Sequence, residues 1–160
     1  MDENRVYNYE AMFVVSQAVA VDLQGVVDHI KEILTKNGAS IIAMKKWDER
    51  RFAYEIQKQK RGVYLLMYFS CPGPNMLAIN RSADLSEKIL RHLITRADHL
   101  TVEEMQAADG QKDLEIEAKL RAQRAAEGYT DLAPEAPAPV RAAVAEAEDA
   151  DEVPDEVSNA

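Results

Sequence analysis

The chain has 160 residues, 47% hydrophobic residues and a net charge of −9, which allow one compact domain with an extension. Its single cysteine, Cys71, excludes an intrachain disulfide framework and a four-cysteine zinc site, and is typical of a protein from a reducing compartment. No apolar run approaches the roughly 18 to 20 residues that span a bilayer, so we expect a cytoplasmic protein without a membrane partner.

The charge is distributed unevenly along the chain. Residues 1–105 hold 14 basic and 14 acidic side chains, whereas residues 106–160 hold 5 basic and 14 acidic ones, so the whole −9 lies in the last third. Residues 45–61 carry 7 basic against 3 acidic side chains, a local charge of +4. This local charge decides what can approach the folded surface there.

The first half of the chain predicts a strand, a helix and a second strand. In the strand over 6–15, Ala11, Phe13 and Val15 fall on one face and Glu10, Met12 and Val14 on the other. Apolar residues then recur with helical spacing from a cap at Asp22, and Asn37-Gly38 ends that helix. Residues 39–47 return to strand character, which continues or bends through 51–56 into a polar, basic loop over 57–61.

The second half repeats the order of strand, helix and strand. Residues 63–71 alternate as the second arm of a long basic hairpin, and Pro74 can start a second helix in which Met76, Ile79 and Ala83 share a stripe. Residues 89–95 form a last strand, with a bulge or two-sided burial where its alternation is blurred.

This order predicts an α+β fold, the ferredoxin-like βαββαβ sandwich, in which a four-stranded antiparallel sheet carries both helices on one face. The other face would be open and unusually apolar, which is typical of a surface that binds a partner. The strand alternation assigns five side chains to this open face: Met12, Val14, Tyr64, Leu66 and Tyr68.

The C-terminal part divides into two further segments after a folded domain over 1–105. Residues 106–127 are expected to form a polar extension with helical composition, in which Ile116 and Leu120 offer only a narrow apolar stripe. Residues 128–160 are rich in Ala, Pro and acidic residues, cannot bury enough apolar surface to offset their ordering entropy, and are expected to be disordered.

The basic hairpin also carries aromatic side chains, since residues 45–68 include one Trp, one Phe and three Tyr. Cations neutralise phosphates and aromatic planes offer stacking surface, so this mixture indicates RNA binding. A solvated charged surface is the ordinary alternative for such a run. The aromatic residues Trp47, Tyr54, Tyr64 and Tyr68 more often pack in a core or a partner interface than on bases.

Over roughly residues 7 to 100 the chain resembles the bacterial small-subunit (30S) ribosomal protein six family. The most specific block is Arg50 to Tyr54, which reads RRFAY after Trp47. Further blocks agree in the same order, namely Tyr9-Glu10, Met12 to Val15, Asn37 to Ala39, Ile56, Lys58, Gly62, Tyr64 and Ile89 to Leu93. Members of that family have the βαββαβ fold, so the resemblance implies the same architecture as the residue pattern.

The resemblance implies a non-enzymatic role in translation. Family members bind the central domain of small-subunit (16S) ribosomal RNA together with ribosomal protein eighteen and support assembly of the platform. We assign phosphate contacts to the hairpin and to the last strand, from Lys45, Lys46, Arg50, Arg51, Lys58, Lys60, Arg61, Arg91 and Arg96. No DNA partner, metal or other cofactor is expected.

Two neighbouring arginines of the hairpin pose a geometric problem. Successive strand residues point to opposite faces, so Arg50 and Arg51 cannot serve one surface unless the strand is bulged or bent. Pairing of one of them with Asp48 or Glu49 is the alternative.

The chain departs from the family pattern at three places. Asp48 stands where Gly is usual, Ala83-Asp84 replaces an apolar-basic pair, and Ser16 to Ala18 lacks the usual Pro after the first strand. Because Asp84 removes a positive charge, we exclude the second helix from the RNA surface.

Two other functions fit parts of the sequence. Arg61-Gly62 with Tyr68 faintly matches the third strand of an RNA-recognition motif, but Val63 and Leu65 stand at the aromatic positions of that motif. An acyl-phosphate hydrolase would need a phosphate-binding loop or a nucleophile with a base, and neither Cys71 nor His29, His92 and His99 has suitable spacing for catalysis or metal binding.

Overall fold

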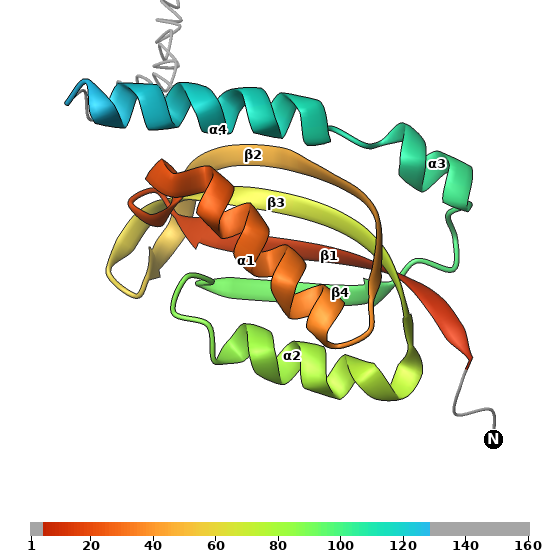
Figure 1. Cartoon of the computed structure of the whole chain (residues 1–160). Coiled ribbons are helices and arrows are strands. Elements are labelled where there is room, and N and C mark those ends of the chain that lie inside the picture. The colour runs from red at the N-terminus through yellow and green to blue at the C-terminus, as the bar shows by residue number, and fades with distance from the viewer. Residues whose placement is uncertain (1–4, 129–160) are drawn as a thin grey trace, which may run out of the picture.

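The computed structural model describes residues 5–128. A four-stranded antiparallel sheet with the order β2-β3-β1-β4 carries α1 and α2 on one face, as predicted for the ferredoxin-like fold (Figure 1). We call this covered side the inner face and the opposite side the outer face. The elements in chain order are β1 (Val6–Ser16), η1 (Val19–Asp22), α1 (Leu23–Lys36), β2 (Ser40–Ile56), β3 (Gln59–Pro72), η2 (Gly73–Asn75), α2 (Met76–Asp84), β4 (Arg91–Arg96), α3 (Val102–Ala107) and α4 (Gln111–Ala126).

The first helix, α1, begins and ends where local sequence signals predict. The Asp22 carboxylate accepts the backbone N–H of Gly25 at 3.0 Å, which satisfies a donor in the first turn of α1. At the other end Gly38 has φ +77°, a conformation that favours glycine, and the chain leaves the helix there. The cap at Asp22 and the end at Asn37-Gly38 are therefore confirmed.

The long hairpin of β2 and β3 ends in a shorter turn than the sequence predicted, although the strand pairing is irregular between Arg51 and Ile56. Ile56 pairs with Gln59, so the turn contains only Gln57 and Lys58 rather than residues 57–61. Both turn residues have positive φ, 48° and 64°. Positive φ at both central residues is typical of a type I′ hairpin turn, whose twist matches that of the flanking strands. Glycine or asparagine usually occupies these two positions.

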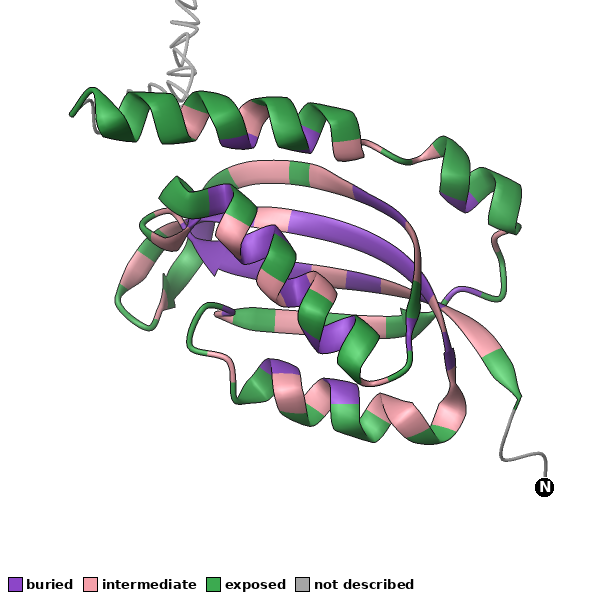
Figure 2. Cartoon of the chain, in the orientation of Figure 1, coloured by how far each residue is buried: buried purple, intermediate pink, exposed green. Residues whose placement is uncertain are grey.

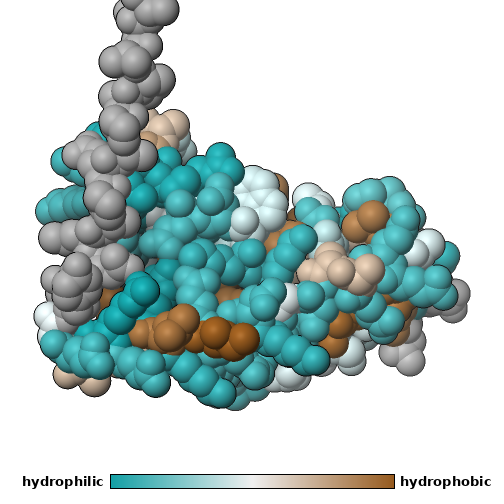
Figure 3. Space-filling model, turned by 90° about the horizontal axis from the view of Figure 1, so that it is seen from above, coloured by the Kyte–Doolittle hydropathy of each residue, from teal (hydrophilic) through white to brown (hydrophobic). Residues whose placement is uncertain are grey.

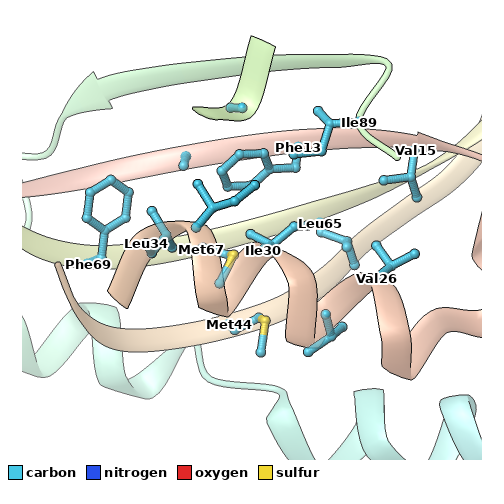
Figure 4. Packing of buried hydrophobic residues seen from close by; sticks show 14 of the residues in the cluster. Phe13, Val15, Val26, Ile30, Leu34, Met44, Leu65, Met67, Phe69 and Ile89 are labelled. Atoms are coloured by element: carbon cyan, nitrogen blue, oxygen red, sulfur yellow. The ribbon is translucent and has the colours of Figure 1, made fainter. Parts of the chain in front are cut away.

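The main core lies between the inner face and α1 (Figure 4). Phe13 and Val15 from β1 meet Leu65 and Met67 from β3, and the buried stripe of α1 closes over them. The apolar residues of that stripe are those predicted from the helical spacing, namely Leu23, Val26, Val27, Ile30, Ile33 and Leu34. On α2, Ile79 and Ala83 are buried as predicted.

The last strand begins later than the sequence predicted. β4 starts at Arg91, while Ile89 is buried before it and the Leu90 N–H donates to the Val14 carbonyl at 2.8 Å. Ile89 therefore contributes to the core from the end of the loop rather than from the strand.

The extension after β4 packs on both sides of the sheet. Leu114 and Ala118 of α4 are buried and join the main core beside α1 and β2, whereas Ile116 and Leu120 are exposed. The apolar stripe predicted for this helix is therefore wrong by two residues. Figure 2 shows the exposed side of α4, and the view from above shows a mostly hydrophilic surface with small apolar patches (Figure 3).

The remaining predicted segment, the acidic tail, lies outside the described residues from 129 onward. Within residues 5–128, no helix has both the length and the apolar character needed to cross a membrane.

Candidate nucleic-acid and partner interface

The five side chains predicted for the open face do share one face of the sheet. In the register of β1 and β3, Met12 pairs with Leu66, Val14 with Tyr64, and Glu10 with Tyr68, which places these residues on the outer face. The outer face is not fully open, however. Leu66 and Tyr68 are buried in a second apolar cluster that includes Met105 of α3.

An interruption of strand pairing shapes the uncovered half of the outer face. Lys46 pairs with Leu65 and Asp48 pairs with Tyr64, so Trp47 is the extra residue of a β-bulge. Its indole lies edge-on to the Tyr64 ring with centroids 6.0 Å apart, and it is 49% exposed. The bulge thus presents a large aromatic side chain to solvent.

The Arg50 guanidinium completes a cation–aromatic cluster at this bulge. Its central carbon lies 4.9 Å from the Trp47 ring centroid and 5.8 Å from that of Tyr64. Phe52 meets Tyr64 edge-on at 6.2 Å and supports the ring from the next outward position of β2. Arginine and aromatic rings in this arrangement can bind either an RNA base with its phosphate or a protein partner.

Arg50 and Arg51 lie on opposite sides of the hairpin, as their adjacency requires. Arg50 pairs with Gly62 and Arg51 with Arg61 in an uninterrupted stretch of the register. The Arg50 Nε donates to the Asp48 carboxylate at 2.8 Å, which confirms the predicted pairing of one arginine with Asp48. The Glu49 backbone N–H and then Arg50 hold the pKa of Asp48 below its usual value.

Lys46 belongs to a different environment from the one assigned to it. Its ammonium group lies on the inner side, 2.9 Å from the Glu49 carboxylate and 2.6 Å from that of Glu117. Arg121 of α4 binds the same two carboxylates and donates to the Ala20 carbonyl at 3.3 Å. The prediction that Lys46 contacts RNA is therefore not supported, because its charge is balanced here and its side chain is only 23% exposed.

The cations nearest the hairpin tip remain accessible. Lys58 is exposed on the two-residue turn, and Lys60 is exposed with only a long 3.7 Å ion pair to Glu55. Arg61 is half-buried, and its Nε is buried without a hydrogen-bond partner among the described residues. The exposed ammonium groups of Lys58 and Lys60 at the hairpin tip are therefore accessible to the phosphates of an RNA.

The three remaining predicted cations are spread over the sheet. Arg91 pairs with Val14 on the outer face, and its guanidinium lies 5.6 Å from the Tyr54 ring centroid. Lys45 is half-buried beside Asp109 and Gly110. Arg96 lies 4.1 Å from the Tyr7 ring centroid and pairs with Asp98 at 2.9 Å, at the far end of β4. Arg91 therefore joins the outer face, whereas Arg96 does not join the hairpin surface.

The prediction that four aromatic side chains pack in a core or a partner interface has different outcomes for different residues. Tyr68 is buried in the second apolar cluster, and Tyr64 is half-buried. Trp47 and Tyr54 are 49% and 61% exposed, so neither belongs to the core of this chain. The Glu117 and Arg121 cluster had no signal in the sequence, because its members lie more than 70 positions from Lys46 or Glu49.

No catalytic arrangement forms among the described residues that the hydrolase hypothesis invoked. Cys71 is fully buried, and burial raises its thiol pKa. A cavity of about 480 Å³ lies between the hairpin tip and the loop before β4, where it is lined by Gln57, Asp84, Glu87, Arg91 and His92. His92 shares a hydrogen bond of 3.1 Å with Asn80. Ser86 also lines the cavity, and its Oγ lies 2.8 Å from His29 Nε2 on α1.

Comparison with known proteins agrees with this architecture. The family model described as Ribosomal protein S6 matches residues 8–96. The small ribosomal subunit protein bS6 of Rhodopirellula baltica is 35% identical over 62% of this chain and 71% of its own length, and that of Fusobacterium nucleatum is 31% identical over 56% of this chain and 97% of its own. The crystal structure of the 30S ribosomal protein S6 from Thermotoga maritima superimposes with a TM-score of 0.55 at 28% identity, covering 64% of this chain and 98% of that one.

These relatives are ribosomal proteins rather than enzymes, in agreement with the prediction of a non-enzymatic role. The matched region ends at residue 96, before α3 and α4. On the family match and the shared fold, the chain belongs to the ribosomal protein S6 family of the small ribosomal subunit.

Proposed function

We propose that this protein binds the central domain of 16S ribosomal RNA together with ribosomal protein eighteen, and that it supports platform assembly on cytoplasmic ribosomes. The observation that carries the proposal is the cluster in which Arg50 lies between the exposed Trp47 and Tyr64 on the outer face. Family membership gives the ribosomal context, and this cluster gives a surface that suits it.

The accessible cations divide into a hairpin group and an outer-face group. Lys58, Lys60 and Arg61 at the tip contact phosphates, and each contact contributes to an affinity that falls with salt. Arg50 and Arg91 form the outer-face group, in which Arg50 lies against the Tyr64 ring and Arg91 against the Tyr54 ring. Lys46 takes no part, since Glu49 and Glu117 already balance its charge.

The apolar half of the outer face suits the protein partner. Tyr64 of β3 is half-buried, and Leu93 of β4 is 65% exposed beside Met12 of β1, whereas Val14, which pairs with Tyr64, is buried. Exposed apolar residues with Trp, Tyr and Arg around them form the composition that dominates protein interfaces. Ribosomal protein eighteen therefore docks here while the hairpin reaches the RNA.

The proposal is tested with the full chain and a central-domain fragment of 16S ribosomal RNA. Arg50→Ala should weaken binding in the presence of ribosomal protein eighteen by about 10- to 100-fold, because a hydrogen bond to a charged group contributes roughly 1.5–3 kcal/mol. The matched control is Lys36→Ala, which removes an exposed cation from the far end of α1. Equal affinities for both variants would rule out the Arg50 cluster as a contact.

A general single-stranded RNA-binding module is the second candidate, favoured by the exposed ring of Trp47. It predicts that an unrelated unpaired RNA of equal length competes as well as the central-domain fragment. Preference for the fragment that depends on ribosomal protein eighteen would exclude this candidate.

A further inference from the structure

The segment over residues 98–109, which includes α3, forms a strap across the outer face. Just before it, Ala97 is fully buried and its N–H donates to the Asn8 carbonyl at 2.9 Å. At its other end the Gly110 N–H donates to the Met44 carbonyl at 2.9 Å, and the Met44 N–H donates to the Asp109 carboxylate at 3.0 Å. The strap is thus fixed to β1 on one side and to the edge strand β2 on the other.

Between these fixed ends, only one side chain of the strap is buried. Met105 is fully buried and packs on Ala43, Leu66 and Tyr68 in the second apolar cluster. The other residues of α3 are exposed, including Val102 at 46%. Leu100 and Ala108 of the strap are partly buried against the same cluster, so Met105 is the central and only fully buried side chain of the cover.

The strap has few interactions that hold it closed. Its helix has six residues, and its N-terminus is held by a reciprocal pair of hydrogen bonds between Thr101 and Glu104. A helix this short does not persist in water without packing, so its order depends on the two fixed ends and on Met105, with Leu100 and Ala108 packed beside it. Segments with few buried contacts open at lower free energy than a core.

The strap also places negative charge beside the basic surface. It carries Asp98, Glu103, Glu104 and Asp109 and no lysine or arginine. Asp109 lies in the same surface depression as Lys45. A closed strap therefore opposes the approach of an anionic ligand to this part of the outer face.

We propose that the surface under Met105 is a docking site for an apolar side chain of the partner protein, and that the strap leaves this surface when the partner binds. The inference rests on the proposed function for the identity of the partner, ribosomal protein eighteen. Met105 shows what the site accepts, which is a flexible apolar side chain presented by a short helix. Displacement joins Leu66 and Tyr68 to the half-buried Met12 and Tyr64 in one continuous docking surface.

The first arm of the test uses the full chain with Met105→Ser, which removes the covering side chain. If the closed strap reduces the fraction of binding-competent protein, this variant should bind ribosomal protein eighteen about tenfold more tightly than the unmodified chain. Val102→Ser changes an exposed residue of the same helix and should leave the affinity unchanged. An affinity that is unchanged or weaker in Met105→Ser overturns the inference.

The second arm needs no partner and so separates this inference from the proposed function. Amide hydrogen exchange of the free protein should be fast at Met105 and Ala108, whose N–H groups donate within α3, and slow at Phe13 in the central strand. If the amides of α3 are as strongly protected from exchange as those of the core, the strap does not open and the inference is overturned, independently of which partner binds. If the exchange is fast but neither form binds ribosomal protein eighteen, the proposed function fails and the docking site fails with it.

Discussion

The Arg121 guanidinium and the Glu49 carboxylate form an ion pair that joins α4 to β2, although the two residues lie 72 positions apart. Glu117 and Lys46 complete the cluster, so two cations and two carboxylates balance one another. The cluster fixes the extension to the edge strand of the sheet. It also explains why a lysine in the basic hairpin is not available to RNA.

Loss of Arg121 should destabilise the protein. Arg121→Met leaves two half-buried carboxylates with only Lys46 as a partner, and we expect a loss of about 1–3 kcal/mol in the free energy of unfolding. This range is smaller than that for a fully buried pair, since the Arg121 and Glu49 side chains are 18% and 19% exposed. Urea unfolding measures the loss, and Lys119→Met on the exposed side of α4 should stay within about 0.5 kcal/mol.

The same cluster should make stability depend on pH. Burial alone would raise the pKa of Glu49 and Glu117, but hydrogen bonds and charges from Lys46 and Arg121 outweigh it and lower both pKa values from 4.5. The unfolded chain therefore binds protons first as the pH falls. The stabilisation should be complete above the unfolded pKa and be lost as the pH falls below 4.5 toward the folded pKa values. Unfolding measured from pH 7 to pH 3 should show a smaller loss in Arg121→Met, and identical pH profiles would contradict this.

Gly62 should be intolerant of a side chain because of its neighbours rather than its backbone angles. A Cβ at Gly62 would lie 2.3 Å from the Phe52 ring and 2.7 Å from the Val15 carbonyl oxygen. Gly62→Ala should cost about 1–3 kcal/mol of unfolding free energy and displace Phe52 from Tyr64. Gly73→Ala is the matched control, since its Cβ would meet Tyr7 at an ordinary 3.6 Å. Equal thermal stability of the two variants would refute the close packing.

Replacement of Lys58 should separate stability from binding. Lys58 has φ 64° at the second position of the turn, where glycine is unstrained. Lys58→Gly should therefore raise the free energy of unfolding by about 1 kcal/mol, while it weakens RNA binding and reduces the salt slope by about 0.7–0.9. Lys58→Gly that binds RNA as well as the unmodified chain would remove the hairpin tip from the interface.

Much of the fold could be predicted because its signals are local. The cap at Asp22, the glycine at 38 and the apolar spacing between them define α1 without reference to other elements. The turn at Gln57-Lys58 could not be predicted in the same way, because its residues lack the usual turn chemistry and the pairing of the two strands imposes their positive φ.

The candidate site could be predicted in composition but not in arrangement. Strand alternation correctly placed Val14 and Tyr64 on one face, since a period of two needs no tertiary information. Burial of Leu66 by Met105 and neutralisation of Lys46 by Glu117 both depend on an extension distant in sequence. The bulge at Trp47 likewise depends on the register with β3.

The central claim is joint binding of the RNA and the partner protein, and the most direct measurement is the affinity of the full chain for a central-domain fragment of 16S ribosomal RNA over a salt series, with and without ribosomal protein eighteen. We predict binding that requires or is strengthened by the partner protein and that weakens steeply as salt rises. Absence of binding in both conditions would contradict the claim.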